Sequence, residues 1–182
     1  MAYCIEAQRV NLRTAGKADT DSIYRYARDR EIGRWTLLPR PYRRKHALAF
    51  VRASKICARK KKPHEILLGI EHKAMGEIIG GIGLHNINYL HKNAEIGCWI
   101  GVPFQRQGLV TEAMQAALKY AFTTLKLKRV YAQVFAGNIA SQKLVKRCGF
   151  TQEGCLRASF FQHNRWRTSY LYSMLREEFK DS

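Results

Sequence analysis

Acidic residues are scarce in this sequence. Its 182 residues include 14 aspartates and glutamates against 32 lysines and arginines, which leaves a formal net charge of +18 at pH 7. A field of this sign attracts polyanions and repels polycations. The charge therefore concerns the partners of the protein rather than its fold. It argues against a small polycation as the ligand unless a local acidic pocket intervenes.

The cysteines and histidines lack the spacing of a disulfide framework or a metal site. There are five cysteines, an odd number, and no two of them form a CxxC pair. Reduced thiols are the ordinary interpretation of such a set. Four histidines lie near one another without the spacing of helical metal ligands, so we expect no metal. They are His64, His72, His85 and His91.

Long apolar runs and linkers are also missing. The apolar stretches are far too short to span a bilayer, and no basic segment followed by an apolar run marks a signal peptide. We therefore expect a cytoplasmic protein. Because no Ser-, Gly- or Pro-rich linker or internal repeat interrupts the chain, we expect residues 8–180 to form one domain.

One segment has a strong compositional bias. Residues 40–62 contain no acidic side chain, and their apolar residues recur at roughly helical spacing. This pattern predicts an amphipathic helix with a very basic outer face, followed by a basic loop before Pro63. Residues 40–62 can dock onto an anionic partner, such as ribosomal RNA or an acidic protein, or their basic face can simply be solvated. Its ten cations are Arg40, Arg43, Arg44, Lys45, Arg52, Lys55, Arg59, Lys60, Lys61 and Lys62.

The rest of the chain alternates strand and helix signals. Apolar runs predict a strand at residues 10–13, a three-stranded meander within residues 66–102, and further strands at 129–134, 152–161 and 167–175. Apolar periodicity predicts helices at residues 20–30, 109–125 and 138–147. With the basic helix, the order is β-α-α-β-β-β-α-β-α-β-β. This is one mixed sheet with helices on its faces, an α/β architecture.

A glycine-containing segment links the third meander strand directly to the long helix. It reads Gln105-Arg106-Gln107-Gly108-Leu109-Val110. A helix N-terminus offers unpaired N–H groups and the positive end of the helix dipole, glycine permits close backbone approach, and arginine adds charge. These features can hold a pyrophosphate. An ordinary strand-to-helix turn is the alternative.

Several sequence segments, which occur in order along the chain, favour the pyrophosphate loop over the ordinary turn. The pattern Gln105-x-x-Gly108-x-Val110 resembles the pyrophosphate loop of GNAT acetyltransferases, with valine where glycine or alanine is usual. Further blocks at residues 80–87, 94–100, 138–144, 148–150, 153–157, 164–167 and 171–175 resemble the Rim-type ribosomal-protein N-acetyltransferases of that family. The resemblance implies a mostly antiparallel central sheet and acetyl-CoA as co-substrate. The cofactor residues that it implies are Gly101, Val102, Gln105, Arg106, Gln107, Gly108, Leu109, Val110, Thr111 and Asn138.

The resemblance also suggests roles for two residues of the short helix. It implies that Asn138 contacts the pantetheine arm of the cofactor and that the hydroxyl of Ser141 reaches the departing thiolate as a proton donor. On the residues alone, Asn138 is equally a helix N-cap and Ser141 a solvated serine. A hydroxyl acts as a general acid only when it is correctly positioned.

A strand residue supplies the second catalytic candidate. Alternation places Glu95 on the face opposite Ile96, where it is either a base for the amine proton or a structurally paired carboxylate. Trp99 shares its face and either walls the acceptor pocket or packs in the core. Cys98 has no adjacent histidine to activate its thiol, so we expect direct transfer without an acetyl-cysteine intermediate.

The chemistry of the acceptor favours a protein N-terminus, such as that of a ribosomal protein. An α-amine has a pKa of roughly 7.7–8.0 and is partly neutral in the cell, whereas a lysine near about 10.4 is not. A weakly specified base therefore suits an α-amine. Two alternatives remain: a ribosome- or nucleic-acid-binding module with a vestigial transferase fold, and an acetyltransferase of small amines.

Overall fold

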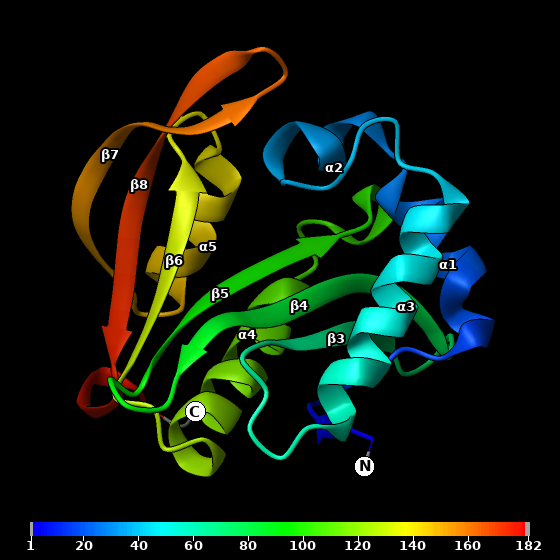
Figure 1. The fold of residues 1–182 in the computed structure, drawn as a ribbon, viewed down its shortest axis with the longest axis horizontal. Helices are drawn as coiled ribbons and strands as arrows, with labels where there is room; N and C mark the ends of the chain where they lie inside the picture. The colour runs from blue at the N-terminus through cyan, green and yellow to red at the C-terminus, as the bar shows by residue number, and fades with distance from the viewer. Residues whose placement is uncertain (1, 181–182) are drawn as a thin grey trace.

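Eight strands form one sheet in the order β1-β2-β3-β4-β5-β6-β8-β7 (Figure 1). The computed structural model describes residues 2–180. All neighbouring strands are antiparallel except β5 and β6, which are parallel. The predicted mixed, mostly antiparallel sheet is confirmed. The strands are β1 (Cys4–Glu6), β2 (Val10–Arg13), β3 (Ile66–His72), β4 (Glu77–Asn88), β5 (Asn93–Ile100), β6 (Arg129–Phe135), β7 (Thr151–Gln162) and β8 (Arg165–Leu175).

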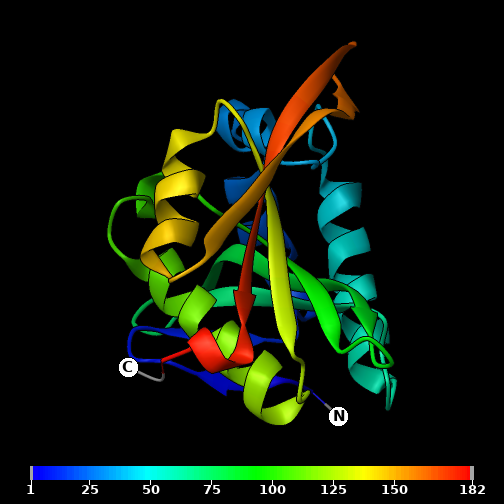
Figure 2. The ribbon, with the colours of Figure 1, turned by 90° about the vertical axis from the view of Figure 1, so that its left-hand side faces the viewer.

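Helices cover both faces of this sheet. On one face α3 packs against α1 and β3, and on the other α4 packs against β2 and β5 while α5 contacts β6. Figure 2 shows α4 and α5 together on the side of the sheet opposite α3. The helices are α1 (Thr20–Ala27), α2 (Arg30–Trp35), α3 (Arg44–Arg59), α4 (Leu109–Lys119) and α5 (Ile139–Arg147).

The apolar periodicity of α4 explains its place in the larger core. Leu109, Ala113, Met114, Ala117 and Leu118 are its buried residues, and all of them belong to the cluster formed with the inward faces of β2 to β6. A second, smaller cluster lies under α1 and α3 and includes Ile78 of β4. The sheet is thus anchored by apolar contacts on both faces, which fixes the strands that carry the site.

Two short elements were not expected from the sequence. Residues 4–6 pair with β2 as the edge strand β1, and the helix expected over residues 20–30 ends at Ala27, with the second helix α2 beginning at Arg30. The division occurs where the side chain of Asp29 accepts a hydrogen bond from the Glu31 backbone at 2.8 Å and so caps a new helix. Three- and six-residue elements are too short for a periodic signal.

The basic helix also differs in its limits. Helix α3 begins at Arg44, and residues 40–43 lie in the preceding loop. Lys60 to Lys62 form the expected basic loop after the helix. Within residues 2–180, no helix is both long and apolar enough to cross a membrane. The predicted domain limits, residues 8 and 180, stay a prediction.

Candidate active site

The parallel strands β5 and β6 pair along only part of their length. Their register has three residue pairs, Asn93 with Arg129, Ala94 with Val130 and Glu95 with Tyr131. Beyond Glu95 the two strands separate, and Figure 1 shows them diverging from this point. The separation interrupts the backbone ladder in the middle of the sheet and leaves an opening between its two faces.

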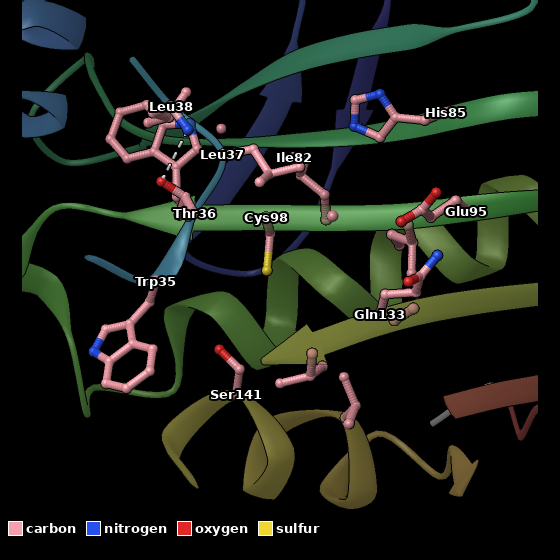
Figure 3. Close-up of a pocket in the computed structure, with 18 of the residues that line it drawn as sticks. Trp35, Thr36, Leu37, Leu38, Ile82, His85, Glu95, Cys98, Gln133 and Ser141 are labelled. Atoms are coloured by element: carbon pink, nitrogen blue, oxygen red, sulfur yellow. Dashed lines mark hydrogen bonds between the residues drawn. The ribbon is translucent and has the colours of Figure 1, made fainter. Parts of the chain in front are cut away.

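A cavity of about 530 Å³ occupies this opening. Strands β4, β5 and β6, helix α5 and the segment after α2 all contribute to its lining (Figure 3). Its polar side chains come from widely separated parts of the chain. They are Thr36, Glu65, His85, Asn86, Glu95, Gln133, Asn138 and Ser141.

The two faces of β5 border the cavity with different side chains. Ile96 and Cys98 point toward the larger core, on the side of α4 and α5. Glu95, Gly97 and Trp99 alternate with them and face the α3 side, as the sequence predicts for Glu95 and Ile96. Trp99 lines the cavity and also packs against the smaller core.

A histidine paired with a glutamate lies beside Glu95, and the sequence did not single out this pair. His85 is the cross-strand neighbour of Glu95, and its Nδ1 lies 2.5 Å from Oε1 of Glu65. Asn86 donates a hydrogen bond from Nδ2 to Oε2 of Glu95 at 3.3 Å. Only strand pairing brings Glu65 to His85, so local sequence patterns carried no signal for the pair.

Asn138 and Ser141 meet at the start of α5, where both border the cavity. The side chain of Asn138 accepts a hydrogen bond from the Ser141 backbone N–H at 3.1 Å, so it caps the helix. This leaves the hydroxyl of Ser141 outside the capping interaction. Figure 3 shows Ser141 on α5 and Cys98 on β5 pointing into the same space.

Cys98 is not suited to nucleophilic attack. Burial, and the nearby Cys148 to a smaller degree, raise the pKa of the Cys98 thiol to about 12. The nucleophile of cysteine chemistry is the thiolate, and at neutral pH this thiol is almost entirely protonated. Direct transfer without an acetyl-cysteine intermediate stays a prediction.

The predicted phosphate loop lies at the end of β5, outside the lining of the cavity. Gly108 is the N-cap of α4, has a left-handed φ of 80° and provides no side-chain cap for the helix amides. A side chain there would be strained, and its β-carbon would come within 3.2 Å of the Arg9 guanidinium. The loop thus presents backbone, together with the exposed side chain of Arg106, to any ligand at the helix terminus.

Two residues that the sequence did not single out, Arg9 and Glu112, hold this segment in place. Arg9 donates a hydrogen bond to the Gln107 carbonyl and forms an ion pair with Glu112 in the first turn of α4, each at 3.0 Å. Burial alone would raise the pKa of Glu112, but hydrogen bonds from the Arg9 and Val10 backbone and the Arg9 side chain hold that pKa below its usual range. The carboxylate is therefore ionised, and Arg9 balances its charge, so it opposes an anion at the helix N-terminus less than an unpaired carboxylate would.

The flanking residues complete the turn. The Gln105 side chain donates a hydrogen bond to the carbonyl of Ile100 at the end of β5, and that of Gln107 donates one to the carbonyl of Pro103. Val110 packs partly buried against the larger core. Gly101 lies against Tyr26, where a β-carbon would come within 2.9 Å of the tyrosine side chain. Val102 is exposed, whereas Leu109 is buried and Thr111 half-buried.

Comparison with known proteins agrees with this geometry. Residues 9–151 match the acetyltransferase (GNAT) domain family. The chain is 30% identical to the uncharacterized N-acetyltransferase YoaA of Bacillus subtilis over 94% of this chain and 96% of that protein. It is 32% identical to the ribosomal-protein-serine acetyltransferase of Escherichia coli over 54% of this chain and 55% of that protein. Spermidine N-acetyltransferase from Vibrio cholerae, crystallised with CoA and spermine, superposes with a TM-score of 0.78 and 27% identity, covering 93% of this chain and 97% of that one.

The fold, the separation of β5 from β6 and the similarity to these relatives define the class of the protein. It is an acetyl-CoA-dependent N-acetyltransferase. The chain belongs to the GNAT acetyltransferase family. The resemblance seen in the sequence blocks is confirmed, and with it the enzyme class.

Proposed function

We propose that this enzyme acetylates the N-terminal α-amine of a protein by direct attack on acetyl-CoA. The observation that carries the proposal is the charge of the cavity. In a protein with a net charge of +18, the residues lining it include Glu65 and Glu95 but no lysine or arginine. An ammonium group is attracted by such a lining, whereas the outer surface repels it.

The cofactor side fits the pyrophosphate of acetyl-CoA. The start of α4 has a glycine N-cap, a first-turn carboxylate whose charge is balanced by Arg9, and the exposed Arg106 just before the cap. These features favour a phosphate at a helix N-terminus. We assign this role to Gly101, Val102 and residues 105–111. Because Asn138 caps α5 and borders the cavity, it supports the far end of the cofactor.

Acetyl-CoA supplies an activated acetyl carbonyl at which the C–N bond forms while the C–S bond breaks. Ser141 is proposed to donate a proton to the leaving sulfur, since its hydroxyl faces the opening between β5 and β6. Glu95 is proposed to take part in removing the proton of the amine from the opposite face, directly or through water. The hydrogen bond that Asn86 donates orients the carboxylate of Glu95 for this role.

Acetylation of a polyamine is the second candidate function, and one observation favours it. The sequence offered few acids for such a ligand, but the structure places two carboxylates in one cavity. One of them, Glu65, is already paired with His85. A polyamine carries several charges, so it finds less compensation here than a peptide with a single terminal ammonium.

The test is a comparison of acceptors under one assay. Binding of acetyl-CoA is measured by isothermal titration, and release of the CoA thiol is then followed with neutral peptides, the same peptides with a blocked N-terminus and one lysine, and spermidine. We expect turnover with free N-termini and little with the blocked peptide. Faster turnover of spermidine supports the second candidate, and binding without any turnover supports a vestigial fold.

A further part of the proposal concerns how the enzyme finds its substrate. We propose that the basic tip, defined as Arg59, Lys60, Lys61 and Lys62, binds ribosomal RNA. All four side chains are exposed at the end of α3. An extended set of exposed cations neutralises phosphates and releases counterions, so affinity should fall with salt at a slope of about −0.7 to −0.9 per phosphate.

The matching experiment replaces all four residues of the basic tip with glutamine. RNA affinity should fall and its salt slope should flatten, while turnover of a short neutral peptide changes little. The control replaces four scattered exposed lysines, Lys73, Lys92, Lys126 and Lys180, and thus removes the same charge. Equal loss in both variants, or loss of peptide turnover in the first, contradicts docking through the basic tip. Binding to an acidic protein in place of RNA does so as well.

A further inference from the structure

Three titratable side chains form one row across the α3 face of the sheet. In the register of β3, β4 and β5, Ile66 pairs with Leu84 and His85 pairs with Glu95. Glu65, which immediately precedes β3, therefore lies beside His85 on the side away from Glu95, and its carboxylate lies 2.5 Å from Nδ1 of the imidazole. A histidine is thus flanked by two carboxylates on a single face.

The free nitrogen of the imidazole is directed toward the glycine-lined floor of the cavity. A β-carbon on Gly83 would lie 2.7 Å from Nε2 of His85, and one on Gly97 would lie 3.8 Å away. Gly83 and Gly97 are paired with each other across β4 and β5, two residues along the strands from the pair of His85 and Glu95 and on the same face. They lie next to the point where β5 leaves β6. Because neither has a side chain, Nε2 remains accessible to a ligand that lies on this floor.

The surroundings of His85 contain little other charge. Glu65, from the segment before β3, and Glu95, on β5, are the charged groups that border the cavity with it, and the thiol of Cys98 lies on the opposite face of β5. The elements that close over the floor contribute apolar or neutral polar groups. They do so through Trp35, Thr36, Leu37, Leu38, Phe50, Gln133, Ser141 and Phe160.

We propose that Nε2 of His85 receives the proton of the acceptor ammonium, with Glu65 as the positioning residue that holds the ring through Nδ1. This inference rests on the proposed acetyl transfer and names the atom that removes the proton. His85 thereby takes over the direct removal of the proton that was proposed for Glu95, and Glu95 takes part by attracting the ammonium and stabilising the imidazolium. The side chain of His85 is 36% exposed, so its proton can pass on to solvent.

The proton balance is complete with these groups. The ammonium gives one proton to Nε2 and becomes a neutral amine, which forms the C–N bond at the acetyl carbon. The remaining excess proton on nitrogen passes to the sulfur as the C–S bond breaks, through Ser141. The imidazolium releases its proton to water, so each turnover yields amide, CoA thiol and one proton.

Intrinsic basicity favours an imidazole over a carboxylate for this step. In model peptides an α-amine, a histidine and a glutamate have pKa values of roughly 7.7–8.0, 6.5 and 4.3. Transfer of a proton from the amine to an ordinary imidazole is therefore unfavourable by only about 10- to 30-fold, and to an ordinary carboxylate by more than about a thousandfold. Glu65 holds the ring through Nδ1, so Nε2 is the nitrogen left to receive the proton.

The test compares His85→Gln with the matched control His91→Gln, whose histidine is exposed in the turn between β4 and β5 and lies outside the cavity lining. For His85→Gln we expect kcat/KM to fall by about 10- to 100-fold at pH 7 and to recover toward pH 9, where the amine is neutral without help. Acetyl-CoA affinity and the thermal midpoint should stay near wild type. The control should retain the wild-type pH profile.

A second variant tests the positioning role by a readout that a structural effect would not produce. Glu65→Gln removes the carboxylate that holds Nδ1, so kcat with a peptide acceptor should fall while acetyl-CoA affinity stays near wild type. Glu65→Asp keeps a carboxylate and should restore part of the lost kcat. A purely structural effect would lower kcat and acetyl-CoA affinity together and would leave Glu65→Asp as impaired as Glu65→Gln.

The outcomes separate this inference from the proposed function. If wild type acetylates amines and His85→Gln keeps its rate and acidic limb, the role of His85 is wrong while the proposed function stands. If His85→Gln loses activity equally at every pH, the residue is structural. If wild type turns over no amine, the proposed function fails, and the assignment fails with it.

Discussion

The two faces of the sheet border one cavity with opposite chemistry. On the α4 face the cavity is bordered by Ser141 and by the almost entirely protonated thiol of Cys98, which suit a thioester. The N-terminus of α4 with Arg106, which suits a phosphate, lies on the same side of the sheet but outside the cavity lining. On the α3 face it offers Glu65, His85 and Glu95, which suit an amine. The net charge of +18 predicts neither distribution, because a global charge describes encounter and solubility rather than a site.

Separation of strands is what brings these two environments into contact. If β5 and β6 remained paired along their full length, the sheet would isolate Ser141 and Cys98 from Glu95 and His85. Their register ends at Glu95, where the cavity begins. Variants on each face should therefore have separable effects, on cofactor affinity from the α4 side and on the amine from the α3 side.

The largest effect is expected at Gly108. Gly108→Val forces a β-branched residue into a left-handed conformation and fills the space needed by a phosphate, so acetyl-CoA affinity should fall on the order of 10- to 100-fold. Isothermal titration measures this directly. Gly76→Val is a matched control, because Gly76 also has a positive φ but has no atom within 4 Å of its β-carbon position. Equal acetyl-CoA affinity in the two folded variants would contradict the phosphate site.

Ser141 lies where the two environments meet and should affect turnover rather than binding. Ser141→Ala should lower kcat roughly tenfold with little change in acetyl-CoA affinity, because it removes the proposed proton donor to sulfur. The helix cap survives, since Asn138 binds the Ser141 backbone and not its hydroxyl. Steady-state kinetics with a peptide acceptor provides the measurement. A rise in KM with unchanged kcat would assign Ser141 to binding instead.

The strands beyond the opening are joined by a pH-sensitive ion pair. Hydrogen bonds from Arg129 on β6, and then Ser173 on β8, lower the pKa of Glu153 from 4.5 to about 2. The Glu153 carboxylate binds a proton less readily in the folded state than in the unfolded state. Its contribution to stability is therefore present above about pH 4.5 and is lost as the pH falls toward 2.

Substitution of Glu153 should therefore have a modest effect that depends on pH. The Glu153 side chain is 37% exposed, so solvent screening limits the expected loss for Glu153→Gln to about 1 kcal/mol in the free energy of unfolding near neutrality. The difference from wild type should shrink as the pH is lowered below 4.5. Urea titrations at several pH values measure it, and a difference that grows with acid would show that the sign is wrong.

The sequence predicted the site unevenly, and the physical reason is the range of each interaction. The turn at Gly108 and the start of α5 are encoded by neighbouring residues, so their places followed from local patterns. The pair of Glu65 and His85 depends on the register of β3 against β4, which no local pattern contains. In the same way, the length over which β5 and β6 stay paired is set by tertiary packing, so the opening itself was not predictable from the residues alone.

The smallest effect is expected at Cys98, on the strand between the two environments. Its thiol has a pKa raised to about 12, so it offers almost no thiolate, and Cys98→Ala should keep kcat within about twofold of wild type. The loss of a partly buried sulfur should cost stability by about 1 kcal/mol or less.

Intact mass and peptide mapping of the wild-type enzyme after incubation with acetyl-CoA should show no acetyl group on Cys98. Cys155→Ala, which alters an exposed thiol on β7, is the control for unspecific acetylation. An acetylated Cys98 that forms and disappears at the rate of turnover would show that the amine attacks an enzyme thioester, and direct transfer would then be wrong.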